Sequence, residues 1–95
     1  MKKKMVIVRP YNASVFYGEL VARKGKEVTL KHARRIWQWS GAQTLSDLAV
    51  VGTSKPAECK FPIHVPEIII TDAYEIITMT PAAVKSLEGV PVWTA

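Results

Sequence analysis

The residues best suited to binding chemistry gather in one stretch of the chain, residues 31–48. Arginine beside a flat aromatic ring can hold a phosphate and a base together, because the guanidinium group donates in a planar fork and also stacks on ring faces. This stretch places such residues next to a Ser-Gly pair: Arg34, Arg35, Trp37, Trp39, Ser40 and Gly41. We predict that these residues form a ligand-binding site.

The two tryptophans have two alternative placements. Trp37 and Trp39 stand two positions apart, so on a regular strand they point the same way and can sandwich a base or a sugar ring. Tryptophan side chains are mostly buried in folded proteins, and the alternative is that both fill the core beneath a following helix. The sequence leaves both placements open.

The polar residues of the stretch have alternatives of the same kind. Arg34 and Arg35 point to opposite faces of a strand, so at most one shares a surface with the tryptophans unless a bulge rotates them. Otherwise both lie on solvated surface and pair with Asp or Glu. Ser40 and Gly41 can offer backbone N–H groups to an anion at a helix start, or they can form a simple turn.

The composition is that of a small basic globular domain. With 95 residues, the chain is long enough for one domain, 1–95, that buries about two-thirds of its unfolded surface. Thirteen Lys and Arg against eight Asp and Glu give a formal charge of +5, which favours nucleic acid, nucleotides or an acidic protein surface as partners. Part of this excess lies in a basic tail, residues 1–4, which holds Lys2, Lys3 and Lys4.

Cysteine usage and motifs narrow the class of protein. Cys59 is the one cysteine, so we expect no internal disulfide and a reduced intracellular compartment. No Cys/His spacing resembles a metal site, and we expect neither a metal nor a cofactor. The first apolar run stops at Arg9 and Pro10, too early for a signal peptide, and no run reaches the roughly 18 residues of a membrane span. The chain lacks Gly-x-Ser-x-Gly, Walker and His-Glu-x-x-His motifs, which disfavours an enzyme.

Hydrophobic patterning and turn residues predict strands with two short helices among them. The expected strands cover residues 5–9, 14–23, 27–39, 58–65, 67–78 and 90–93, and Asn12 is expected in a turn. One expected helix lies between Thr44 and Gly52 and the other covers 82–88. The fold class is therefore α+β, a small antiparallel sheet or a partly open barrel of about five or six strands.

Three local patterns make sharper predictions. In the strand at 27–39, Val28 and Leu30 require one face inside and Trp37 with Trp39 the other, which predicts a bulge at 32–34. Thr44 with Asp47 predicts a capping box, and Thr80 before Pro81 predicts a helix start. The continuous run Ile68, Ile69 and Ile70 predicts a strand buried on both sides.

Several segments together resemble a known group of sequences. They are His-Ala-Arg-Arg-Ile-Trp-Gln-Trp-Ser-Gly-Ala at 32–42, Leu-Ser-Asp-Leu-Ala at 45–49, Cys-Lys-Phe-Pro at 59–62 and Val-Pro-Val-Trp at 90–93. With them nearly the whole chain resembles a family of short uncharacterised proteins encoded by tailed phages. That family has no established catalytic residues to carry over. The resemblance implies a phage accessory protein that antagonises host immunity, by binding a defence protein or by sequestering a nucleotide signal.

The leading hypothesis is a non-enzymatic phage accessory protein of the host cytoplasm, a homo-oligomer that captures a small nucleotide-type anion or blocks a defence component. Arg34 and Arg35 would hold phosphate, Trp37 or Trp39 would stack a base, and a two-fold interface would complete the pocket. One alternative is a nucleic-acid-binding protein with a phosphate track along Lys2, Lys3, Lys4, Lys24, Lys26, Arg34 and Arg35. The other is a structural component of the particle.

Overall fold

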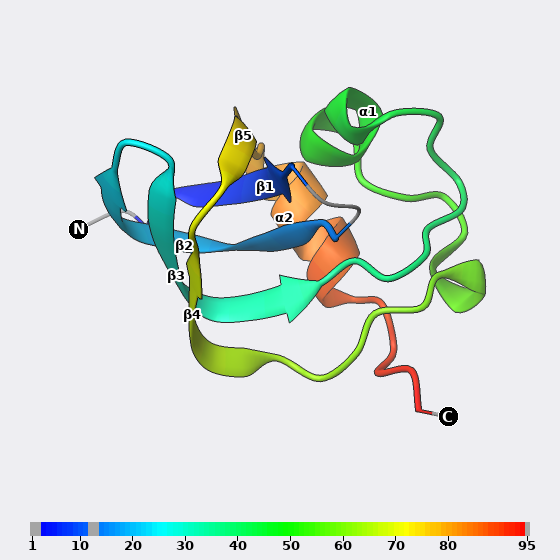
Figure 1. Cartoon of the computed structure of the whole chain (residues 1–95). Coiled ribbons are helices and arrows are strands. Elements are labelled where there is room, and N and C mark those ends of the chain that lie inside the picture. The colour runs from blue at the N-terminus through cyan, green and yellow to red at the C-terminus, as the bar shows by residue number, and fades with distance from the viewer. Residues whose placement is uncertain (1–2, 12–13, 95) are drawn as a thin grey trace.

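The chain forms a curved five-stranded sheet with two short helices in this computed structural model, which describes residues 3–11 and 14–94 (Figure 1). The strands are β1 (Met5–Pro10), β2 (Phe16–Lys24), β3 (Glu27–Arg35), β4 (Val65–Ile70) and β5 (Ala73–Thr78). The helices are α1 (Leu45–Val50) and α2 (Pro81–Glu88), and a 3₁₀ turn, η1, covers Pro56–Glu58. The predicted α+β class is confirmed, and the sheet is open. Asn12 and Lys2 lie outside the described residues.

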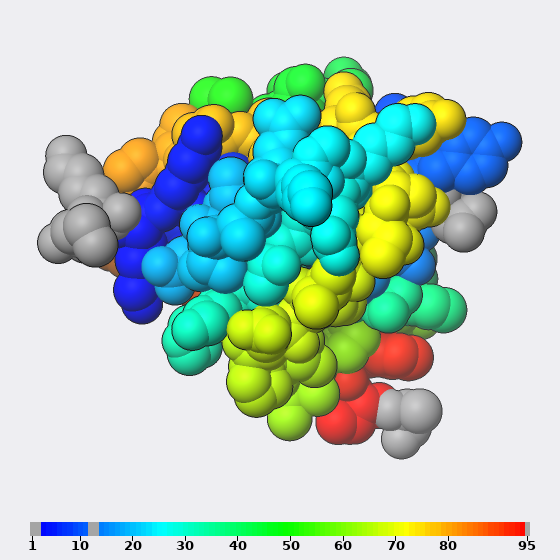
Figure 2. Space-filling model, turned by 60° about the vertical axis from the view of Figure 1, so that its left-hand side comes forward, coloured from blue at the N-terminus to red at the C-terminus, as the bar shows by residue number. Residues whose placement is uncertain are grey.

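A link of two residues joins the two edge strands of the sheet. The strand order is β4-β3-β2-β1-β5, and every neighbouring pair is antiparallel. β4 and β5 therefore lie at opposite edges although only Thr71 and Asp72 separate them in the sequence. The Ala73 N–H donates to the Lys26 carbonyl at 3.0 Å, which ties this link to the β2–β3 hairpin. Figure 2 shows the yellow link lying beside the cyan hairpin.

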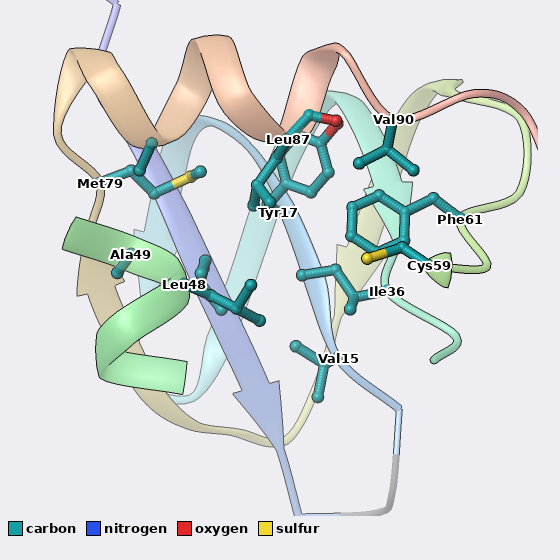
Figure 3. Packing of buried hydrophobic residues seen from close by; sticks show 12 residues of the cluster. Val15, Tyr17, Ile36, Leu48, Ala49, Cys59, Phe61, Met79, Leu87 and Val90 are labelled. Atoms are coloured by element: carbon teal, nitrogen blue, oxygen red, sulfur yellow. The ribbon is translucent and has the colours of Figure 1, made fainter. Parts of the chain in front are cut away.

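Both faces of the sheet are apolar, because strand residues alternate between them. On one face, Ile7 and Tyr17 pack with Leu48 of α1 and Leu87 of α2, and Figure 3 shows these helices facing the strands. The other face is concave and holds a second cluster: Val6, Val8, Phe16, Val28, Leu30, Ala33, Ile70 and Ala73. Ile70 and Ala73 flank the β4–β5 link, so the curl of the sheet buries the concave face.

The predicted bulge in β3 is confirmed. His32 has a φ of 50°, and the β2–β3 register shifts between the pairs Tyr17–Arg34 and Glu19–Lys31. The extra residue lets Leu30 and Ala33 share the concave face. Opposite the bulge stands Gly18, where a Cβ would lie only 3.0 Å from the Cα of Ala33. Glycine is required there because the two backbones approach closely.

Local signals located the helices, whereas several strand boundaries were wrong. Thr44 and Asp47 form the capping box of α1, and Thr80 caps α2 with Pro81 at its first turn. The expected strand at 27–39 ends at Arg35, because its pairing partner Phe16 is the first residue of β2. Beyond it, Trp37 and Gln38 donate their N–H groups to the Lys60 carbonyl, at 3.1 and 3.2 Å.

The second half of the chain contains less strand than the pattern predicted. Residues 67–78 form two strands rather than one, and Ile69 is 54% exposed, so the isoleucine run is not buried on both sides. The run lies in β4, an edge strand with one solvated face. Residues 58–65 and 90–93 contribute only isolated bridges outside β4, Gln38–Lys60 and Phe61–Val92.

Candidate functional site

Arg34 lies on the helix-covered face and is fully buried at 1% exposure. Its Nε donates to the Pro62 carbonyl at 2.8 Å, Nη2 to the Phe61 carbonyl at 3.2 Å and Nη1 to the Leu87 carbonyl at 3.3 Å. The guanidinium carbon also lies 5.3 Å from the centre of the Phe61 ring. Arg34 therefore fastens β3 to the segment before β4 and to the end of α2. Its donors face the protein interior and not a ligand.

Arg35 lies on the opposite face and is half-buried. Its Nη1 donates to the Ser14 hydroxyl at 2.7 Å, and its guanidinium carbon lies 4.6 Å from the centre of the Phe16 ring. The ion pairs in the part of the chain that the structure describes are Arg9–Glu75 and His64–Glu88. Arg35 thus has no carboxylate partner among residues 3–11 and 14–94, and its contacts there are a neutral hydroxyl and a ring face.

Hollows in the surface meet at Arg35. One, of about 200 Å³, extends over Ser14 and Ile36 to Trp37. Another, of about 220 Å³, extends along the concave face past Phe16 to Asp72, and a third, of about 160 Å³, runs over Phe16 towards β4. Each is smaller than the roughly 300 Å³ of a small-molecule pocket, and all three share Arg35. We call the surface formed by Ser14, Phe16, Arg35 and Trp37 the Arg35 groove.

The tryptophans separate, because the backbone leaves strand geometry after Arg35. Trp37 is 61% exposed, whereas Trp39 is partly buried against the core beneath the helices. The ring partner of Trp37 is Trp93, with planes 7° from parallel and centroids 6.5 Å apart. The Lys60 Nζ lies 5.5 Å from the centre of the Trp93 ring. An exposed pair of indoles beside a cation therefore borders the Arg35 groove.

Ser40 and Gly41 form a packed crossing of two loops. Gly41 has a φ of 82°, and a Cβ there would lie 2.6 Å from the Lys55 nitrogen. The Ser40 N–H points at the Cys59 Sγ at 3.5 Å, and the Ser40 carbonyl accepts from the Thr53 hydroxyl. α1 begins beyond them, at the predicted cap Thr44. Gly41 lies in a bend, so of the two alternatives the structure favours the turn.

The structure thus brings together part of the predicted set. Arg35 and Trp37 line one hollow, whereas Arg34, Trp39, Ser40 and Gly41 lie apart from it or face inward. Sequence reasoning missed Ser14 and Phe16, which reach Arg35 because β2 begins opposite the end of β3. It also missed Trp93, for which the terminal Val-Pro-Val-Trp segment was the available signal.

A network of polar side chains lies on the helix-covered face of the sheet, where β2 meets the end of α2. The Tyr17 hydroxyl donates to Glu88 Oε2 at 3.0 Å, and the same carboxylate oxygen lies 2.6 Å from His64 Nε2. Burial raises the pKa of Tyr17 well above its ordinary value; Arg34 opposes this shift and the Glu88 carboxylate adds to it. The hydroxyl therefore stays a neutral donor that holds the end of α2 to the sheet.

Within residues 3–11 and 14–94, no three His, Cys, Asp or Glu side chains gather in a way that could hold a metal ion. In the same described part of the chain, no helix has the length and apolar character needed to cross a membrane.

The fold and groove define a small α+β domain with a curved open antiparallel sheet. Residues 3–87 match the model of the domain of unknown function DUF6948, and the chain belongs to this family. No curated protein and no solved structure matches the chain. The family match does not bear on an origin in tailed phages, which stays a prediction.

Proposed function

We propose that the protein is a non-enzymatic binding protein that captures a nucleotide-type anion in the Arg35 groove. The observation that carries the proposal is the half-buried Arg35 guanidinium, which has no carboxylate partner in the described part of the chain and stands beside the exposed Trp37. The neighbouring Arg34 supplies the contrast, since carbonyl oxygens accept from each of its nitrogens.

Removing a cation from water costs free energy. A partly desolvated charge is unfavourable unless a partner compensates it, and a guanidinium group has five N–H donors, of which Ser14 accepts from one. A phosphate beside Arg35 would accept from the others in charge-assisted bonds. The formal charge of +5 would also draw anions toward the surface.

The base of a nucleotide would stack on Trp37. Trp37 shares a hollow with Arg35 and is 61% exposed, so one face of a planar ligand can reach it without displacing the core. Stacking on an aromatic side chain tolerates any base. An anion with a flat ring fits this pairing better than inorganic phosphate does.

The biological setting of the proposal comes from the resemblance. We retain a phage accessory protein that acts in the host cytoplasm, where it sequesters a nucleotide signal or blocks a defence protein. Assembly into a homo-oligomer also stays a prediction. The alternative nucleic-acid track loses Arg34, whose donors face inward, and a structural role in the particle has no observation in its favour.

Calorimetric titration with linear and cyclic nucleotides tests the proposal. We expect the unsubstituted protein to bind at least one of them, and R35Q to bind it roughly tenfold or more weakly, because a charge-assisted hydrogen bond is lost. R23Q is the matched control, since Arg23 is exposed and its Nε bonds only the carbonyl of Gly25 in its own hairpin. No heat with any nucleotide would overturn the proposal.

A further inference from the structure

A second exposed aromatic cluster lies near the Arg35 groove. Tyr11 and Tyr74 are 67% and 53% exposed, and their ring centroids lie 5.1 Å apart. The Lys26 Nζ lies 4.9 Å from the centre of the Tyr74 ring. We call these residues the tyrosine platform. Its members come from the end of β1, from β5 and from the β2–β3 hairpin, so the fold and not the sequence brings them together.

The concave hollow that contains Arg35 reaches residues next to the tyrosine platform. Its lining includes Arg35, Pro10 and Asp72. Tyr11 follows Pro10 in the chain, and the Tyr11 N–H donates to the Asp72 carbonyl at 3.0 Å, so the platform adjoins two residues of this hollow. Figure 2 shows the blue end of β1 and the yellow start of β5 at the upper right, with the red C-terminal segment below them.

The surface around these hollows carries two aromatic clusters, each with a nearby cation. Trp37, paired with Trp93 near Lys60, shares one hollow with Arg35. The tyrosine platform, with Lys26, adjoins Asp72, which shares the concave hollow with Arg35.

From this arrangement we propose that the ligand of the Arg35 groove has two bases joined through a phosphate. The phosphate binds Arg35, one base stacks on Trp37 and the other stacks on the tyrosine platform. The ligand is therefore a dinucleotide unit, either free or within a single strand. This inference rests on the proposed function and extends it from one base to two.

Asp72 orients the ligand. It is half-buried and lines the hollow beside the tyrosine platform. A carboxylate repels a second phosphate at that end, so the phosphate stays at Arg35 and the neutral base occupies the far end. The same carboxylate can accept a hydrogen bond from the amino group of a base.

Titration with AMP and with the dinucleotide ApA tests the inference. Each has one phosphorus centre, and AMP carries more negative charge, so tighter binding of ApA reports the second base. We expect ApA to bind about fivefold or more tightly than AMP, which is the low end of base stacking on an aromatic side chain. We expect Y11A and Y74A to lower ApA affinity to the AMP level and to leave AMP affinity unchanged.

T78A is the matched control, because Thr78 is exposed at the opposite end of β5, and circular dichroism checks the fold of each variant. The oligonucleotide A8, which has the same sugar as ApA, separates the two sources. Binding tighter than the statistical gain from its overlapping ApA registers assigns a single strand, and binding within that gain assigns a free dinucleotide. The inference is overturned if AMP binds as tightly as ApA, or if the tyrosine variants weaken both equally. If neither nucleotide binds, the proposed function itself fails.

Discussion

Arg34 and Arg35 are adjacent in the sequence and lie on opposite faces of the sheet. The first donates to the carbonyl oxygens of Phe61, Pro62 and Leu87, and the second donates to the Ser14 hydroxyl at the surface. The bulge at His32 determines which arginine faces the interior, because one residue more or less there would exchange the faces of Arg34 and Arg35. We therefore expect Arg34 to act in stability and propose that Arg35 acts in binding, and substitutions can separate the two roles.

Replacing Arg34 tests its structural role. We expect R34M to lower the free energy of unfolding by about 3 kcal/mol, because three buried carbonyl oxygens lose their donor. R35Q, with a half-exposed side chain, should cost about 1 kcal/mol or less. Urea unfolding of both variants measures the difference, and equal losses would contradict the assignment.

Glycine substitutions test the loop crossing at Gly41. G41A combines a φ of 82° with a Cβ that would lie 2.6 Å from the Lys55 nitrogen, so we expect a loss of about 3 kcal/mol or more. Gly25 is the control, since its φ is 59° and nothing lies within 4 Å of the added Cβ. G25A should therefore cost only about 1 kcal/mol. Thermal unfolding of the pair separates backbone strain from steric clash.

The Tyr17 hydroxyl makes stability depend on alkaline pH. Its pKa is raised in the folded protein, so its contribution is complete below the ordinary tyrosine value of about 10 and falls as the pH rises beyond that value. Y17F should lose about 1 kcal/mol at neutral pH through its hydrogen bonds and then show a smaller alkaline fall. Urea unfolding between about pH 8 and pH 11 measures this, and parallel curves would refute it.

The two tryptophans should respond differently to truncation. W39A removes a partly buried ring from the helix-side core, and we expect it to cost about 2 kcal/mol of unfolding free energy. W37A removes an exposed ring and should cost about 1 kcal/mol or less, while it weakens nucleotide binding by about fivefold or more. Unfolding and calorimetry on the same samples test both parts. Equal stabilities with unchanged binding would contradict this division.

Local patterns predicted the parts of the fold that depend on neighbouring residues. The capping box joins Thr44 and Asp47, which lie within one helical turn. The bulge follows because the two halves of the expected strand place their apolar residues on different faces. The end of β3 was not predictable in this way, because it depends on where β2 begins. The split of residues 67–78 depends likewise on the curl that brings Ala73 to Lys26.

The candidate site was predictable only in part for the same reason. The types and spacing of Arg35 and Trp37 pointed to two residues that line one hollow. The other residues of the groove come from other elements: Ser14 from before β2 and Phe16 from its first position. Trp93, which stacks on Trp37, comes from the C-terminal segment. Nothing in the spacing of Arg34 indicated that its acceptors would be carbonyl oxygens 27 to 53 residues away.

The most direct test of the central claim, that Arg35 holds an anion, is a calorimetric comparison of unsubstituted protein and R35Q with the tightest-binding nucleotide. The two proteins should show the same fold by circular dichroism. The predicted result is an affinity roughly tenfold or more weaker for R35Q, with R23Q unchanged. Equal affinity of R35Q and unsubstituted protein would contradict the claim.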